Sequence, residues 1–407
     1  MIHRPRLKIM CVFGKHQYGD PARGFGTEYA AFIPALEHLG HEVIHFESWN
    51  RASHADFAAL NLALLKAVLR ERPDILLAVQ MNYEIWIETL EVIRKTADVA
   101  TVCWTTDDSW KYREVSRLIG RAYDAMTTTY PEVVPKYRRD GIPNVLLTQW
   151  AANSSAMAAP LPASQCRFPV TFVGAAQGNR PQWIRDLGRR GIAVRCFGHG
   201  WPEGSVDARQ IPEIMRQSVI SLNFSNSRQG RQIKARTFEV PGAGGFLMTE
   251  TAPGLERWYR IGEEIDVFRT LPELAVKIQN YLKSPDRRDA MALRGFHRTR
   301  QAHTYEQRMA DVVAFALRAK GNRSGKGGGE AGSLRLETLL SQAAAAHRMS
   351  RPTAWLKQAL VSGCSAVWGR KRGPRAARRL VFEMSWRFMG RKTFTASGLP
   401  GRMFPEQ

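Results

Sequence analysis

The chain has 407 residues, of which 44% are hydrophobic and 24% charged, and its formal net charge is +22. This length is sufficient for two compact domains and an extension, and this composition is typical of a globular protein rather than a disordered one. No stretch approaches the roughly 20 consecutive apolar residues that would span a bilayer. We therefore expect no transmembrane segment.

The N-terminus and the cysteines indicate a cytoplasmic protein. The apolar run after the basic N-terminus is short and ends at Gly14 without a cleavage-like segment, which predicts a first buried strand rather than a signal peptide. The five cysteines are odd in number and show no paired CxxC spacing, which argues against a zinc site or a disulfide framework.

Strand-like apolar runs follow one another along the first half of the chain. They cover 7–13, 42–46, 74–79, 99–105, 124–129 and 144–149. Helical patterns separate them, for example apolar residues at helical spacing from Tyr29 to Leu39, ended by Gly40. Such alternation predicts a parallel sheet that helices cover on both faces.

The pattern begins again after a connection rich in Pro, Ala and Ser at 151–167. The second set of strands is expected at 169–174, 193–198, 219–224, 246–249 and 265–269. We therefore predict an α/β protein with two Rossmann-like, doubly wound domains, 1–158 and 159–320, that face a cleft. Ligands of such folds bind at the carboxyl ends of the strands.

The C-terminal part differs in composition. A Gly/Ser-rich linker is predicted at 321–333, followed by a basic, partly helical extension at 334–407. Residues 321–407 hold 16 Lys or Arg and four Glu, so more than half of the excess positive charge lies there.

The extension allows three interpretations. On a helical wheel, Leu380, Val381, Met384 and Phe388 share one face, while arginines between 375 and 379 lie roughly opposite. This layout is typical of a helix on an anionic membrane surface, here through 351–395. A poorly ordered basic tail, or a tail that binds nucleic acid or another acidic partner, stays open.

The segment "QIKARTFEVPGAGGF" (232–246) combines two cations, a carboxylate and a glycine cluster. These residue types suit a nucleotide sugar: cations for the diphosphate, a carboxylate for the ribose hydroxyls, and glycines that let the chain turn tightly beside the ligand. The candidate residues are Lys234, Arg236, Glu239, Gly242, Gly244 and Gly245. The alternative is that Glu239 pairs with Arg236 on a helix surface and the glycines only join helix to strand.

Over residues 168–315, the run "RTFEVPGAGGFLMTE" and the later "IGEEIDVFRTLPELAVKIQNYLKSPDRRDAM" resemble the CgeB-like (spore maturation protein CgeB) family of GT-B glycosyltransferases, with a glycosyl transferase family 1-like C-terminal domain. The first half, with "TVCWTTDDSW", is similar but less specific. The resemblance implies transfer of a sugar from a nucleotide-sugar donor to a glycan or another hydroxyl-bearing acceptor. It implies neither a cofactor nor a metal, because GT-B enzymes generally stabilise the leaving diphosphate with Lys, Arg and helix N-termini.

Within this resemblance, Glu239 matches the carboxylate that holds the donor ribose in related enzymes. Relatives often carry a second Glu eight positions earlier, where this chain has Arg231. That departure keeps a second hypothesis open, in which the protein binds a nucleotide sugar without turnover and acts as an assembly partner.

The first domain offers further candidates. Gly24 and Gly26 precede a predicted helix after the first strand, as a phosphate or acceptor loop or as a plain turn. Asp107 follows the fourth strand and is the candidate general base, while its neighbour Asp108 is a candidate helix cap.

Arg180 and His199, in loops of the second domain, are further candidate donor contacts. The acceptor is expected to be a cell-surface glycan or lipid-linked precursor, reached from the inner membrane surface. A nucleic-acid-binding protein is the weaker alternative, because the first 320 residues carry less than half of the excess charge.

Overall fold

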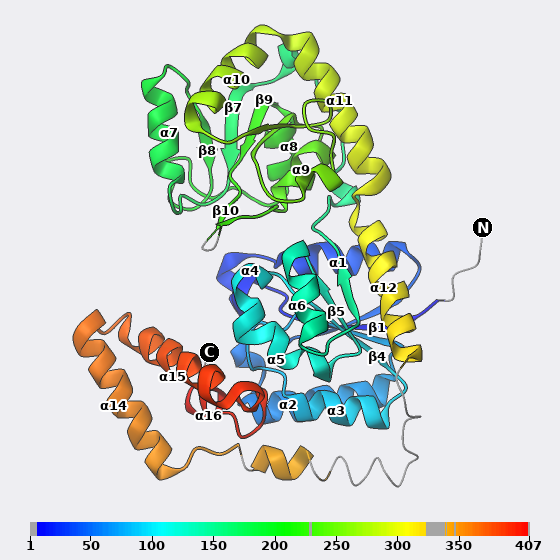
Figure 1. Ribbon diagram of the computed structural model, residues 1–407, viewed down its shortest axis with the longest axis vertical. Helices are drawn as coiled ribbons and strands as arrows, with labels where there is room; N and C mark the ends of the chain where they lie inside the picture. Colours follow the sequence, from blue (N-terminus) through cyan, green and yellow to red (C-terminus); the bar gives the residue numbers. More distant parts are fainter. Residues whose placement is uncertain (1–5, 228–229, 323–337, 339, 346, 406–407) are drawn as a thin grey trace. The chain divides into compact units, whose positions relative to one another are not determined.

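The computed structural model describes residues 6–227, 230–322, 338, 340–345 and 347–405 (Figure 1). The chain forms two compact units. The first unit combines Met1–Thr148 with Met309–Gln407, and the second unit is Gln149–Arg308. The units therefore differ from the predicted domains 1–158 and 159–320 at both boundaries.

Side-chain contacts explain the shifted boundaries. Arg288, fully buried in the second unit, donates to the carbonyl of Leu161 at 2.7 Å, and Arg216 Nε donates to the carbonyl of Ala159 at 2.9 Å. These contacts hold the connection after residue 148 within the second unit. Lys320, by contrast, forms an ion pair of 2.7 Å with Asp98 in the first unit.

The first unit is built on a parallel sheet of six strands. The strands are β1 (Lys8–Val12), β2 (Glu42–Phe46), β3 (Ile75–Ala78), β4 (Ala100–Trp104), β5 (Ala125–Thr128) and β6 (Val145–Leu147). Their order across the sheet is β2-β1-β3-β4-β5-β6, with Ile9 aligned to Val43 on one side and Ile75 on the other. All six predicted strands are confirmed, and the central ones are almost wholly buried because helices cover both faces.

Helices connect the strands of the first unit. They are α1 (Thr27–His38), α2 (Phe57–Glu71), α3 (Ile87–Thr96), α4 (Asp108–Lys111), α5 (Arg117–Ile119) and α6 (Val134–Arg139). The predicted helix stop is confirmed, since α1 ends before Gly40, whose φ is +87°. Helix α12 (Tyr305–Gly321) runs from the second unit into the first.

The second unit holds a parallel sheet of five strands. The strands are β7 (Phe168–Val173), β8 (Arg195–Phe197), β9 (Ser218–Asn223), β12 (Leu247–Glu250) and β13 (Asp266–Phe268), in the order β13-β12-β9-β7-β8. The helices are α7 (Arg180–Arg189), α8 (Ile211–Arg216), α9 (Arg236–Gly242), α10 (Leu271–Lys283) and α11 (Pro285–Ala302). The five predicted strands are confirmed, and a short hairpin of β10 (Asn226–Ser227) and β11 (Gly230–Arg231) was not predicted.

The C-terminal extension packs on the first unit. It contains α14 (Arg351–Trp368), α15 (Gly373–Met389), a 3-10 turn (Gly390–Phe394) and α16 (Leu399–Met403), drawn in orange to red in Figure 1. Phe382, Trp386 and Phe394 are buried in the same hydrophobic cluster as Tyr83 and Trp86. The interpretation of a poorly ordered tail is therefore wrong for these helices.

The predicted linker at 321–333 lies outside the described residues from residue 323 onward. Across the parts of the chain that the structure describes, no helix combines the length and the apolar character needed to cross a bilayer.

Candidate functional site

Both sheets have the same topology, which fixes where a ligand can bind in each unit. In each sheet the first strand in sequence lies between the second and the third, with β1 between β2 and β3, and β7 between β8 and β9. The connections after the first and the third strand leave these adjacent strands in opposite directions, and they open a crevice outside the carboxyl ends of the two. The candidate sites are therefore the edges beyond β1 and β3 and beyond β7 and β9.

Two loops form the edge of the second unit at β7 and β8. The indole nitrogen of Trp201 donates to the carbonyl of Gly174 at 2.7 Å, and the amide of Ala176 donates to the carbonyl of His199 at 2.9 Å. Gly198 has a φ of +134°, and a Cβ there would lie 2.5 Å from the oxygen of Gly174. This close approach holds the exposed His199 beside the loop that follows β7.

Arg236 and Arg180 converge on the end of β7. Arg236 Nε donates to the carbonyl of Val173 at 3.3 Å, and Arg180 donates to the carbonyl of Ala175 at 3.1 Å while lying over the Phe172 ring. Burial, together with the charge of Arg180, lowers the pKa of Arg236 to about 10, although Tyr305 opposes the shift. Both guanidiniums stay protonated at neutral pH and place two positive charges at this edge.

Glu239 lies one turn into α9 and forms an ion pair with Arg236. The ion pair between Glu239 and Arg236, which is the alternative to a role in ligand binding, is therefore present. Both side chains nevertheless remain about one quarter exposed, at 25% for Glu239 and 28% for Arg236. Lys234, also partly exposed, lies two residues before α9 at the same edge.

The glycines of the motif lie at the other end of α9. Gly242, Gly244 and Gly245 lead into β12 at its amino end, whereas Arg236 lies at the carboxyl edge of the sheet. A Cβ on Gly244 would lie 2.5 Å from the carbonyl oxygen of Ala158. The tight turn therefore serves packing inside the second unit, and we leave these glycines out of the proposed donor site.

Arg231, where relatives often carry a Glu, is also tied within the protein. Its Nε forms a 3.1 Å ion pair with Glu250 at the end of β12, and its NH2 donates to the carbonyl of Arg269 at 3.2 Å. The buried Glu250 also accepts from the amide of Ser225 at 3.0 Å. Arg231 thus anchors the hairpin strand β11 to the same edge.

In the first unit, the two neighbouring aspartates have different environments. Asp108 is buried and accepts hydrogen bonds from Thr105, Ser116 and Tyr137 at 2.6–2.8 Å, so it does not cap α4 as expected. Burial raises the pKa of Asp108, against these hydrogen bonds. Asp107 is partly exposed, and its carboxylate forms no hydrogen bond or ion pair with any of the described residues. Asp107 is thus the available carboxylate of the pair.

The loop after β1 lies near Asp107. Gly26 is the N-cap residue of α1, and Gly24 has a φ of +76° with open space around its Cα, which fits a tight turn. Glu28 lies in the first turn of α1, and burial raises the pKa of its carboxyl group. The positive charge of Lys111 lowers this pKa, and the negative charge of Asp107 raises it further. These two carboxylates and Lys111 therefore interact electrostatically at the edge beyond β1 and β4.

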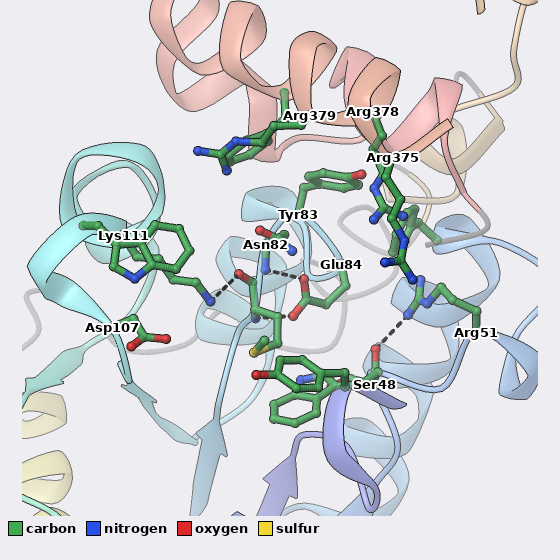
Figure 2. Close-up of a pocket in the computed structure, with 16 residues that line it drawn as sticks. Ser48, Arg51, Asn82, Tyr83, Glu84, Asp107, Lys111, Arg375, Arg378 and Arg379 are labelled. Carbon is green, nitrogen blue, oxygen red and sulfur yellow. Dashed lines mark hydrogen bonds between the residues drawn. The ribbon is translucent and has the colours of Figure 1, made fainter. Parts of the chain in front are cut away.

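A cavity of about 380 Å³ opens at this edge, entirely within the first unit (Figure 2). Its lining comes from the loops after β1, β2, β3 and β4 and from helices α2, α4 and α15. Of its polar residues we predicted only Asp107 from its position. The sequence alone does not identify the other polar residues of the lining, which are Ser48, Arg51, Asn82, Glu84, Lys111, Arg375, Arg378 and Arg379. Its helical pattern places the last three on the exposed face of a surface helix. No local motif marks them, because they come together only through the fold.

Among the described residues, no group of three or more His, Cys, Asp or Glu side chains is arranged to hold a metal ion. The absence of a metal requirement stays a prediction.

Residues 180–314 match the family described as Glycosyl transferase-like. Sucrose-phosphate synthase from Thermosynechococcus elongatus is similar over 77% of this chain and 100% of its own, at 12% identity and a TM-score of 0.55. HepE from Anabaena, solved in complex with UDP, is similar over 76% of this chain and 100% of its own, at 11% identity and a TM-score of 0.53.

A glycosyltransferase from Rickettsia africae is similar over 79% of this chain and 100% of its own, at 10% identity and a TM-score of 0.52. No curated protein matches the chain. The fold is therefore the GT-B fold of glycosyltransferases. Its second unit, from Arg180 onward, carries the glycosyl transferase-like sequence.

Proposed function

We propose that the protein is a glycosyltransferase that transfers a sugar from a UDP-sugar to a hydroxyl group of an acceptor. The observation that carries the proposal is the convergence of Arg180, Arg236 and Glu239 on the carboxyl end of β7. This is the ligand position of a doubly wound sheet, and it lies within the region that matches glycosyl transferase-like sequences. HepE, which shares the fold, was solved with UDP and with UDP-glucose.

The proposed donor contacts follow from charge and geometry. Arg236 and Arg180 stabilise the diphosphate, whose negative charge grows as the bond to the sugar breaks. Glu239 accepts hydrogen bonds from the ribose hydroxyls, and the donor then replaces part of its pairing with Arg236. Lys234 and His199 are further donor contacts at the rim.

Asp107 is proposed as the general base in the first unit. It takes the proton of the acceptor hydroxyl, whose oxygen forms a bond to the anomeric carbon of the sugar. The bond from that carbon to the diphosphate breaks, and the diphosphate leaves with the electron pair. Gly24 and Gly26 are proposed to shape the loop beside the acceptor.

The proposed reaction needs no metal, because the two arginines supply the positive charge that a divalent cation would provide. Transfer is expected to continue unchanged when EDTA is added to the purified protein. Recovery of lost activity by Mg²⁺ or Mn²⁺ would contradict this expectation. Membership in the CgeB-like subfamily is proposed on the resemblance of two runs, 236–250 and the later one that begins at Ile261.

A cytoplasmic location at the inner membrane surface is also proposed. Exposed aromatic side chains of α14 and α15 support it, because Trp355 (71% exposed), Trp368 (55%) and Phe388 (82%) lie among exposed cations. Of the predicted apolar face, Leu380, Met384 and Phe388 are exposed, whereas Val381 is buried.

Removal of residues 321–407 would uncover the core around Trp86, so substitutions test the membrane proposal better than truncation does. Replacing Trp355, Trp368 and Phe388 by Ser should reduce sedimentation with vesicles that contain anionic lipid. The control variant Val276→Ser, at an exposed position of α10, should sediment like the wild type. Equal sedimentation of all three proteins would refute the membrane contact.

The first test of the main proposal is a thermal-shift panel of nucleoside diphosphates and nucleotide sugars, run on the wild type and on Glu239→Ala. A ligand that binds only the native state raises the melting temperature. UDP or a UDP-sugar should stabilise the wild type and fail to stabilise the variant. If no nucleotide stabilises the wild type, the donor-site proposal is wrong.

Arg231 favours a second candidate, an inactive relative that binds the donor and acts as an assembly partner. Its ion pair with Glu250 leaves a cation where relatives often place a carboxylate. Binding of UDP-sugar without release of UDP, with any of the acceptors supplied, would support this candidate. Release of UDP with formation of a glycosylated product would exclude it.

A further inference from the structure

The cavity of the first unit has strongly unbalanced charge. The cations that line it are Arg51, Lys111, Arg375, Arg378 and Arg379, and the carboxylates are Glu84 and Asp107. The cations therefore outnumber the carboxylates. The contacts of each charged group show where the positive charge stays uncompensated.

Two of the cations and one carboxylate have partners of their own. Arg379 forms an ion pair with Glu114 at 2.8 Å and another with Glu383. Lys111 Nζ donates to the carbonyl of Met81 at 3.3 Å. The carboxylate of Glu84 accepts from the backbone amides of Met81 and Asn82 (Figure 2).

Three guanidinium groups then remain on one side of the cavity. Figure 2 shows Arg375 and Arg378 extending from α15 toward Arg51. Within the described part of the chain, neither Arg375 nor Arg378 has a hydrogen bond or an ion pair. Arg51 donates to the carbonyl of Ser48 at 2.7 Å and lies 4.2 Å from the centre of the Phe57 ring. The charges of Glu84 and Glu47 act on Arg51 and offset part of its positive charge, whereas Arg375 and Arg378 add positive charge that no carboxylate pairs with among the described residues.

Ser48 supplies an independent observation at the same cavity. Its side chain is fully buried and lines the cavity, yet its hydroxyl oxygen has no hydrogen-bond partner among the described residues. A buried hydroxyl without a partner costs free energy, so native proteins rarely leave one unsatisfied. The hydroxyl therefore adds a polar group to the wall of the cavity, on the residue whose carbonyl accepts from Arg51.

We propose that this cavity binds a phosphate or diphosphate group of the acceptor through Arg51, Arg375 and Arg378. Three guanidiniums offer more charge and more donors than a single carboxylate can use, whereas a phosphate carries up to two charges and three terminal oxygens. The rings of Trp49 and Trp110 line the same cavity and suit the apolar face of a sugar.

This inference rests on the proposed function and specifies its acceptor. Asp107 lies across the cavity from the three arginines (Figure 2). The acceptor is thus held by its phosphate at one side and presents its hydroxyl to the base at the other. The C-terminal extension acts as the specificity element, since two of the three arginines belong to α15.

The test measures binding of pyrophosphate by calorimetry to three full-length proteins. All three carry Arg236→Ala, which weakens the proposed donor site equally in each, so that differences among the three report on the cavity. The first has no other change, the second adds Arg375→Ala and Arg378→Ala, and the third adds Arg370→Ala and Arg372→Ala. The third is a matched control, because it removes the same charge from exposed positions outside the cavity.

Removal of Arg375 and Arg378 should weaken pyrophosphate binding by at least about tenfold, since each arginine contributes charge-assisted hydrogen bonds. The control should stay within about twofold of the parent. An affinity that is unchanged by the cavity substitutions, or reduced equally by the control, would overturn the inference.

A UDP titration with Arg236 intact separates this inference from the proposed function. If UDP fails to bind while pyrophosphate still depends on Arg375 and Arg378, the donor proposal fails and the anion site stands. If UDP binds and the cavity substitutions have no effect on pyrophosphate, the anion site fails alone.

Two further titrations identify the source of the phosphate. One uses glucose 1-phosphate, and the other uses phosphatidylcholine vesicles with and without farnesyl phosphate. Binding that depends on Arg375 and Arg378 in the first titration indicates a water-soluble acceptor, and in the second a lipid-linked one. Binding of neither probe would overturn the assignment to an acceptor phosphate.

Discussion

The two sheets share one strand order but differ in how the site at the switch point is built. In the second unit, Arg180, Arg236 and Glu239 all come from within about 60 residues and contact one another or the adjacent strand ends. In the first unit, the loops after four strands meet a helix from the far end of the chain, and among the described residues Arg375 and Arg378 have no hydrogen bond or ion pair. The common topology thus sets where the two candidate sites lie, and the added elements decide which side chains line them.

The largest expected effect is on the rate of transfer, and it distinguishes the proposed catalytic role of the first unit from nucleotide binding by the second. Asp107→Asn should lower kcat by about 10²–10⁴-fold, because an amide cannot accept the acceptor proton. The affinity for UDP should stay unchanged, the reverse of the result expected for Glu239→Ala. Steady-state kinetics with a UDP-sugar and calorimetry with UDP measure the two quantities. A kcat near that of the wild type would assign the base elsewhere.

The next effect tests whether the extension is part of the first unit. Trp386 is buried in its core, and Trp386→Ala should lower the free energy of unfolding of that unit by about 3–5 kcal/mol. Hydrogen exchange of β3 and β4 reports the change, while β7 and β9 serve as the internal reference. Trp368→Ala, at an exposed position of α14, is the matched control and should have little effect. Equal protection of β3 in both variants would show that the extension does not stabilise the sheet.

A pH effect is expected in the second unit. His303 Nδ1 accepts from Arg308 at 3.0 Å and Nε2 donates to the carbonyl of Trp258 at 2.7 Å, and burial lowers the pKa of His303 to about 4. The unfolded state, with a pKa near 6.5, then binds more protons than the native state between these values. Stability from the neutral ring is therefore present above pH 6.5 and is lost as the pH falls toward 4.

Between pH 7 and pH 5 this loss should reach about 2 kcal/mol. Hydrogen exchange of β9 in the wild type and in His303→Gln measures it, since the glutamine does not titrate. Parallel pH profiles of the two proteins would contradict the assignment to His303.

The smallest effect concerns an exposed ion pair of the extension. Arg379 contacts Glu114 at 2.8 Å, but its side chain is 44% exposed. Arg379→Ala should therefore change the stability of the first unit by only about 0.2–1 kcal/mol, and added salt should reduce the difference. Urea denaturation at low and high salt measures this. A loss as large as that of Trp386→Ala would mean that charge, rather than apolar packing, holds α15 in place.

Part of the candidate site could be predicted from local sequence. Arg236 and Glu239 lie three residues apart in one motif, and their place between two predicted strands puts them at the carboxyl edge. The glycines of the same motif were assigned to the ligand because sequence shows that a tight turn is needed, but not what lies beside it. The carbonyl of Ala158, far away in the chain, is what comes close to Gly244.

The sequence by itself determined the two parallel sheets, because buried strands and amphipathic helices have periodicities that are read locally. It also placed Arg236 and Glu239 of the proposed donor site in one motif between two strands. The tertiary structure alone decided the rest. It turned Arg375 and Arg378 of α15 toward Arg51 (Figure 2), left the Ser48 hydroxyl without a partner among the described residues, and distinguished the partly exposed Asp107 from the buried Asp108. Such contacts join residues hundreds of positions apart, and packing of the whole unit fixes them rather than any local preference.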